Sequence, residues 1–369
     1  MSGQTASRFE QYTVQQYARA VRPHLPAEIF QPAPARLAWL PLHLAIIVGL
    51  GAVVVAAQPA WYVALACALL AGHSWACLGF LAHEVLHHAV VRQRGIERLV
   101  GYCGLLIFCL SPTLWIAWHN QQHHGNTGSP GADPDHFGTL HSWQASAVDR
   151  AVVSVAPGSR RKRSALFLFV TFTAHSATVL LSHSRRDDYY ARISRRTVYL
   201  ETAAMLAFWL AVLLAVGAWS FLFVGVIPAL IANAVAMSYI ATNHFLNPLT
   251  TMNDPLVNSL SVRGPRWLER LHLNFGYHVE HHIFPTVSGR HAPMVRAALR
   301  RLYGDRYLSL PHGRALRLLY SRPKVHASHD TLIDPRSGQV FNALAPGDLS
   351  MARVAPPLPL IGTAAHAGG

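Results

Sequence analysis

Three short histidine clusters have spacings that could bring several imidazole rings to one metal site. The first, residues 83–87 (HEVLH), has the HExxH pattern that is typical of zinc proteases. The others are HNQQHHGNTG, with His119, His123 and His124, and FGYHVEHHIFP, with His278, His281 and His282. Residues four apart on a helix project from the same face, so each cluster can present at least two rings together.

The number of imidazoles exceeds what one zinc ion uses. A catalytic zinc takes three protein ligands and keeps an open position, whereas the three clusters hold eight well-spaced histidines. Two metal ions are therefore indicated. Imidazole suits iron, copper and zinc alike, so ligand type alone does not select the metal. A pair of iron ions best explains why so many neutral donors gather.

Composition indicates that these clusters belong to a membrane protein. The 369 residues are 51% hydrophobic and 13% charged, about half the charge of an ordinary soluble domain. The net charge of +14 has no DNA-reading motif or aromatic-interleaved basic stripe beside it, so we expect no nucleic-acid partner. The cysteines lie in apolar runs without CxxC spacing, and we expect them to be packing residues. They are Cys67, Cys77, Cys103 and Cys109.

Two long segments without charged residues predict four membrane-spanning helices. Residues 37–83 contain no Asp, Glu, Lys or Arg, which is about twice the length that one span needs. Gln58-Pro59-Ala60 can break this segment into a hairpin. A second such segment lies between Glu201 and Asp254 and is interrupted at residues 217–220. The prediction is four spans in two hairpins.

Two further apolar segments, residues 99–118 and 164–184, are each long enough to span but have basic flanks. Basic residues favour the cytoplasmic side, and the two hairpin turns carry none. We therefore expect both segments to be interfacial or re-entrant, with a turning point at Ser111-Pro112. This topology places all three clusters on the cytoplasmic side, whereas a crossing at residues 99–118 would separate the first cluster from the second.

The expected fold is an all-α integral membrane protein with interfacial helices and a cytoplasmic histidine-rich di-iron domain. Residues 1–36 show no cleavable signal pattern and form a cytoplasmic N-terminal segment. Residues 37–326 form the membrane-bound domain. Residues 327–369 lose apolar periodicity and end rich in Pro, Ala and Gly, so we expect this tail to be poorly ordered.

The three clusters resemble the histidine boxes of the integral-membrane di-iron fatty acid desaturases and hydroxylases, written HxxxH, HxxHH or HxxxHH, and HxxHH. The resemblance covers residues 83–285, and NFGYHVEHHIFP is most similar to the acyl-lipid desaturases. It also implies a further ligand after the last span, where ATNHF supplies His244. The implied metal ligands are His83, His87, His119, His123, His124, His244, His278, His281 and His282.

Several residues near the boxes have open roles. His88 departs from the minimal first box, and its ring is expected to face away because neighbouring helical residues point about 100° apart. Glu84 and Glu280 either hold the second ring nitrogen of a ligand or are solvated carboxylates. Asp133 and Asp135, in GADPDHF, either orient ligands or pair with cytoplasmic arginines.

The resemblance implies an oxygen-dependent, membrane-bound non-haem di-iron enzyme of lipid metabolism that introduces a double bond into a fatty acyl chain. Electrons would come from an external, ferredoxin-like carrier, because the sequence has no haem-binding fusion, flavin fingerprint or iron-sulfur cysteine pattern. A fatty acyl hydroxylase or a carotenoid ketolase would use the same boxes. An intramembrane zinc protease would explain HEVLH but leaves the other clusters without a role. A metal transporter would place its ligands at mid-membrane rather than at one surface.

Overall fold

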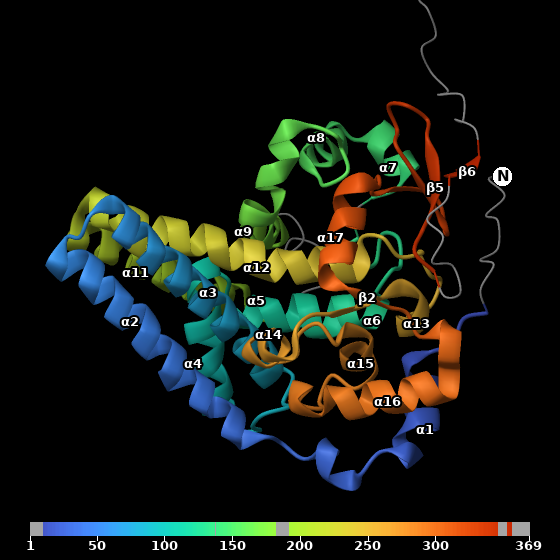
Figure 1. Cartoon of the computed structure of the whole chain (residues 1–369), viewed down its shortest axis with the longest axis horizontal. Coiled ribbons are helices and arrows are strands. Elements are labelled where there is room, and N and C mark those ends of the chain that lie inside the picture. The colour runs from blue at the N-terminus through green and yellow to red at the C-terminus, as the bar shows by residue number, and fades with distance from the viewer. Residues whose placement is uncertain (1–9, 137, 182–191, 346–352, 356–369) are drawn as a thin grey trace, which may run out of the picture.

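The computed structural model describes residues 10–136, 138–181, 192–345 and 353–355 (Figure 1). The first nine residues, Arg185, Arg186 and residues 346–352 and 356–369 of the expected tail lie outside the described part. The described chain is mostly helical. Its α-helices are α1 (Val14–Val21), α2 (Trp39–Ala57), α3 (Trp61–Leu86), α4 (Arg94–Leu105), α5 (Pro112–Trp115), α6 (His124–Asn126), α7 (Leu140–Ala145), α8 (Ala147–Val155), α9 (Phe167–Leu181), α11 (Arg195–Phe221), α12 (Ile227–His244), α13 (Pro255–Asn258), α14 (Arg266–Leu271), α15 (His278–Ile283), α16 (Ala292–Tyr303) and α17 (His312–Ser321).

Four helical segments of the described chain are long and apolar enough to cross a membrane. They are Pro34–Ala57, Trp61–Leu86, Lys162–Leu181 and Arg195–His244. The last has 50 residues and includes α11 and α12, and Gly217, near the end of α11, kinks it with φ 76° and ψ 162°. Gln58, with φ 43°, separates α2 from α3. Both breaks lie where the sequence predicts the two hairpin turns.

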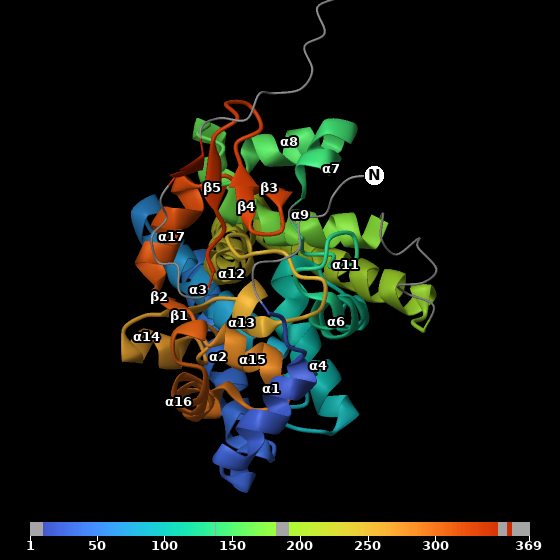
Figure 2. The ribbon, with the colours of Figure 1, turned by 90° about the vertical axis from the view of Figure 1, so that its right-hand side faces the viewer.

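The two turns lie beside each other, because residues of both line one hollow of about 390 Å³. In Figure 1, α2, α3, α11 and α12 extend together toward the left, and the shorter elements of the histidine segments lie toward the right. Figure 2 views that right-hand end, where α13 and α15 lie side by side. The long helices therefore have their turns at one end and the histidine segments at the other.

The two ambiguous apolar segments differ from each other. Arg94–Phe108 and Pro112–Asn126 are bent by 96°, and the break lies at the predicted turning point. There the Ser111 hydroxyl accepts a hydrogen bond from the amide of Leu114 and caps the new helix. Lys162–Leu181, in contrast, is a straight segment that meets the length and apolarity of a span. Its interfacial position remains a prediction.

Helix α3 packs against α2, α4 and α12 and so forms the centre of the helical part. Two glycines allow this close packing. A Cβ atom on Gly72 would lie 2.8 Å from the carbonyl oxygen of Pro228 in α12. A Cβ atom on Gly104 of α4 would lie 2.4 Å from the carbonyl oxygen of Leu78. Any larger residue at either position would push the neighbouring helix away from α3.

Short strands complete the fold. Strand β1 (Ser261–Arg263) pairs in parallel with β2 (Ser309–Pro311), and a four-stranded antiparallel sheet has the order β3-β4-β5-β6. The expectation of a poorly ordered tail is wrong for residues 327–345, because Leu332, Ile333 and Val340 are buried in the sheet. The expected boundary at 326 and 327 falls inside β3. The sheet strands are β3 (Val325–Ser328), β4 (Thr331–Ile333), β5 (Val340–Asn342) and β6 (Arg353–Ala355).

Candidate metal centre

All nine histidines of the predicted ligand set lie in two adjoining groups that could each hold a metal ion. They come from the end of α3, the π-helix Ile116–His123 with the start of α6, the end of α12, and α15. The first group contains His83, His87, His119, His124 and His281. The second contains His123, His244, His278 and His282. Within each group the candidate ligand atoms all lie within 4.8 Å of one another.

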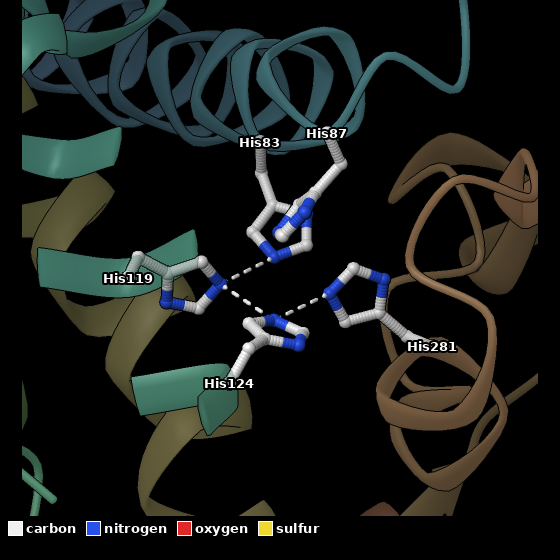
Figure 3. Close-up of side chains that lie close together, drawn as sticks. All are labelled: His83, His87, His119, His124 and His281. Carbon is white, nitrogen blue, oxygen red and sulfur yellow. Dashed lines mark hydrogen bonds between the residues drawn. The ribbon is translucent and has the colours of Figure 1, made fainter. Parts of the chain in front are cut away.

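In the first group the Nε2 atoms converge on a common centre (Figure 3). The Nε2 atoms of His83 and His119 are 3.1 Å apart, and those of His119 and His124 are 3.3 Å apart. The Nε2 atoms of His124 and His281 are 3.1 Å apart. His87 is buried, and its Nε2 has no hydrogen-bond partner among the described residues. An unpartnered, buried nitrogen beside four others is accounted for if a metal ion accepts its lone pair.

The second group lies directly beside the first. The Nε2 atoms of His278 and His244 are 2.6 Å apart, and those of His282 and His278 are 3.0 Å apart. The ring of His282 stacks on His124 of the first group, with centroids 4.4 Å apart. His123, in the second group, lies on the same π-helix as His119 of the first.

These spacings fit a shared metal ligand sphere. Two nitrogens that are each about 2.1 Å from a metal lie about 3.0 Å apart at a right angle and about 3.4 Å apart at a tetrahedral angle. The contacts between Nε2 atoms range from 2.6 to 3.3 Å. Burial lowers the pKa of His278, His281 and His282 well below the usual 6.5, so these rings are neutral and can donate a lone pair.

The π-helix explains how the second box serves both groups. Its wider turn lets the amide of His124 donate to the carbonyl oxygen of His119, five residues earlier. His119 and His124 therefore meet in the first group, while His123 joins the second. The i and i+4 residues of this box, His119 and His123, thus belong to different histidine groups, although ligand atoms of both also lie within 4.8 Å of each other and of Asp135.

Two carboxylates orient His123. The protonated Nδ1 of His123 lies 3.0 Å from Asp133 Oδ1 and 3.4 Å from Asp135 Oδ2. Asp135 Oδ1 in turn accepts hydrogen bonds from Trp118 Nε1 at 2.8 Å and His175 Nε2 at 3.0 Å. Of the two roles left open for these aspartates, the structure shows the orienting one. Such contacts direct the Nε2 lone pair of His123 into the group.

Glu84 matches neither of the roles considered for it. Its Oε1 accepts hydrogen bonds from the hydroxyl of Ser288 and from the amide of Gly289, the latter at 2.9 Å. Its Oε2 lies 3.4 Å from Arg36 Nε. It is buried rather than solvated, and it holds no ligand histidine. Its contacts tie α3 to the chain that follows α15.

Glu280 has the same kind of structural role. It accepts hydrogen bonds from Ser261 at 2.6 Å and from the Tyr307 hydroxyl at 2.5 Å, and burial raises its pKa despite the nearby Arg296.

His88 behaves as predicted. Its Nδ1 lies 2.5 Å from Glu97, its side chain is largely exposed, and it belongs to neither group.

Sequence reasoning missed the residues that support the ligands from outside the boxes. Trp115 stacks on the ring of His119 with centroids 4.6 Å apart, and Asn120 donates a 2.9 Å hydrogen bond to the carbonyl oxygen of Leu86 at the end of α3. His175 holds Asp135 and lies in the apolar segment 164–184. A histidine inside such a segment is itself a signal of function.

An apolar cavity of about 170 Å³ ends at both histidine groups. Its walls come from α3, α9 and α12 and from the loop before α15, and they include Phe80, Phe108, Phe172, Met237 and Phe275. His83 and His119 of the first group and His123, His244 and His278 of the second also line it. The cavity can therefore place an apolar chain against either group.

Comparison with known proteins agrees with this geometry. The family model described as "Fatty acid desaturase" matches residues 59–314. The Delta(6)-fatty-acid desaturase fat-3 of Caenorhabditis elegans is 22% identical over 260 residues, which cover 62% of this chain and 55% of that protein. The Delta(5) fatty acid desaturase fat-4 of the same organism is 22% identical over 239 residues, covering 60% of this chain and 53% of that protein. The chain spans about half the length of these curated relatives, and it belongs to the fatty acid desaturase family.

Proposed function

We propose that this chain is an oxygen-dependent, membrane-bound di-iron desaturase that introduces a double bond into a fatty acyl chain. The observation that carries this proposal is an apolar cavity that ends at two adjoining groups of histidine imidazoles. The cavity suits a hydrocarbon chain, and the groups suit metal ions. The names of the two nematode relatives agree with the substrate class.

In this proposal the five histidines of the first group hold one iron ion and the four of the second hold the other. The iron pair would activate dioxygen and supply the oxidising power that no amino-acid side chain has toward an unactivated methylene. Overall, the acyl chain loses two hydrogens, and dioxygen with two electrons and two protons becomes two water molecules. The nine ligand positions are part of the proposal.

The cavity would select the carbon atoms that react. The aromatic rings of Phe80, Phe172 and Phe275 exclude water and narrow the space beside the imidazoles. A chain held this way keeps one pair of methylenes near both groups, and a shift of about 1 Å would change reactivity strongly. We therefore propose that the product has its new double bond at one dominant position.

Electrons would arrive from an external carrier on the cytoplasmic side. Exposed arginines lie on α16, which packs against α15, and on α14, which precedes α15 in the chain; they include Arg266, Arg270, Arg300 and Arg301. Such a basic surface suits an acidic, ferredoxin-like protein, because opposite charges speed encounter and orient the partners. The proposal places residues 37–326 in the bilayer-bound enzyme, with both hairpin turns on the opposite side.

The alternatives differ in how well the site supports them. A zinc protease needs the glutamate of HEVLH to activate a water molecule at the metal. Glu84 instead binds Ser288, Gly289 and Arg36, so it is engaged away from the histidine groups. A fatty acyl hydroxylase or a carotenoid ketolase would use the same histidine groups and cavity. The chemical identity of the reaction product distinguishes these two enzymes from a desaturase.

The test is expression in a host that supplies iron and a compatible electron carrier, followed by mass spectrometry of its lipids. We expect acyl chains that are lighter by two hydrogens, with one dominant double-bond position. The product should disappear without oxygen and in the His281→Ala variant. Addition of one oxygen atom would replace the proposal with hydroxylation, and a change confined to carotenoids would replace it with a ketolase.

A further inference from the structure

A third cluster of metal-binding side chains lies on α3, away from the two histidine groups. His73 and Cys77 lie one turn apart on α3, and His272 follows α14. The Nε2 atoms of His73 and His272 are 2.9 Å apart, and Cys77 Sγ is 3.9 Å from His73 Nδ1. His73 precedes His83 by ten residues, which is about 15 Å along a helix. The cluster is therefore separate from the candidate iron centre.

The surroundings of this cluster suit a metal ion. Cys77 and His272 are buried, and all three candidate ligand atoms lie within 4.8 Å of one another. The Tyr239 hydroxyl lies 2.8 Å from His272 Nδ1. When this Nδ1 carries the proton and donates to the hydroxyl, the Nε2 lone pair is free for a metal. Polar groups inside a candidate span are costly, and they are usually retained for a function.

A fourth donor is close to the cluster. His43 of α2 is 2% exposed, and neither of its ring nitrogens has a hydrogen-bond partner in the part of the chain that the structure describes. It interacts electrostatically with both His73 and His272. A buried imidazole with two unsatisfied nitrogens calls for an explanation, and a shared metal ion supplies one.

We infer that His73, Cys77 and His272 bind a structural zinc ion, with His43 as a candidate for the fourth ligand. Zinc takes histidine nitrogens at about 2.0–2.1 Å and a cysteine thiolate at about 2.3 Å, so a cluster of histidine and cysteine suits this metal. The Nε2 of His73 faces His272 and its Nδ1 faces Cys77, so zinc binding requires the His73 ring to turn and the thiolate to approach a single nitrogen. Cys77 binds as the thiolate and releases its proton. Cys77 is thus more than the packing residue that its apolar surroundings predict.

The ion would fasten the chain that leads into the third histidine box. The residues after His272 include Leu273 and Asn274, which have left-handed φ values of 53° and 62°. Phe275 follows, stacks on Phe80 of α3 with centroids 4.3 Å apart, and lines the apolar cavity. A zinc ion between α3 and His272 would hold this strained loop, and with it α15, in place.

The test uses the full-length protein in detergent, loaded first with iron and then with zinc chloride. Metal analysis should find one tightly bound zinc per chain, and zinc X-ray absorption should show one sulfur neighbour at about 2.3 Å. Cys77→Ser should remove that sulfur signal and weaken zinc binding while the iron content is unchanged. Cys103→Ser is the matched control, because Cys103 lies on α4 and is outside the cluster.

Iron loading keeps this test separate from the proposed desaturase activity, since the readout is sulfur-bound zinc rather than turnover. Wild-type zinc without a sulfur neighbour, or an unchanged sulfur signal in Cys77→Ser, would overturn the inference. If Cys77→Ser fails to fold, cobalt replaces zinc in the wild-type protein. A thiolate-to-cobalt charge-transfer band then supports the site, and its absence overturns it.

Discussion

Replacing Asp133 by asparagine should weaken metal binding in the second histidine group. The carboxylate of Asp133 accepts hydrogen bonds from His123 Nδ1 at 3.0 Å, from the amide of Gly128 at 2.8 Å and from the amide of Asp135 at 3.0 Å. All three partners are donors, so an asparagine NH₂ group faces a donor in either orientation. One hydrogen bond to an ionised group contributes about 1.5–3 kcal/mol. That free energy corresponds to roughly a 10- to 100-fold loss, which agrees with the usual effect of residues that orient metal ligands.

The assay is competition with an iron chelator in detergent, comparing the wild-type protein with Asp133→Asn. We expect the weaker of the two binding steps to shift by that factor while the first group keeps its iron. Asp305→Asn makes the same chemical change at an exposed position and should leave both steps unchanged. Unaltered iron affinity in a folded Asp133→Asn protein would refute the inference that this carboxylate supports a ligand.

Three further predictions follow from the same contacts. His281→Ala should abolish turnover and lower iron content, because it removes a donor from the first group, whereas His88→Ala should keep both; equal iron loss would show that the assignment of His88 is wrong. Glu84→Gln should lower the free energy of unfolding by roughly 1.5–3 kcal/mol, because one hydrogen bond to a charged group is lost, and should therefore lower the thermal unfolding midpoint. The variant should retain its bound iron. Loss of iron with unchanged stability would contradict that structural role. Topology reporters near Pro59 and Ala218 should lie outside, and one at Arg161 should lie inside. A reporter at Arg161 on the outer side would contradict a single cytoplasmic site.

Much of the arrangement could be predicted because its signals are local. The charge-free segments and their breaks at Gln58 and Gly217 need only a count of apolar residues and knowledge of proline and glycine. Eight of the nine candidate ligands lie in the boxes, whose spacing is short-range, and the ninth, His244, was implied by the family resemblance. His88 was correctly expected to point away from the ligands, although it follows the end of α3 with a left-handed φ of 62° instead of continuing the helix.

Other features depend on contacts or backbone forms that a sequence does not display. The division of His119 and His123 between two groups follows from a π-helix, whose i to i+5 hydrogen bond is absent from ordinary helical periodicity. Glu84 finds Ser288 at a separation of 204 residues, so no local pattern could reveal its partner. The strands after residue 325 are three or four residues long, too short for a clear alternating pattern.

We propose that the two all-histidine groups hold two iron ions. Iron analysis combined with iron X-ray absorption, on protein purified without oxygen, tests this proposal. We expect about two irons per chain, with nitrogen ligands dominating both, in agreement with the donor atoms of the two groups. A single metal ion per chain, or a fully active protein that contains zinc and no iron, would contradict it.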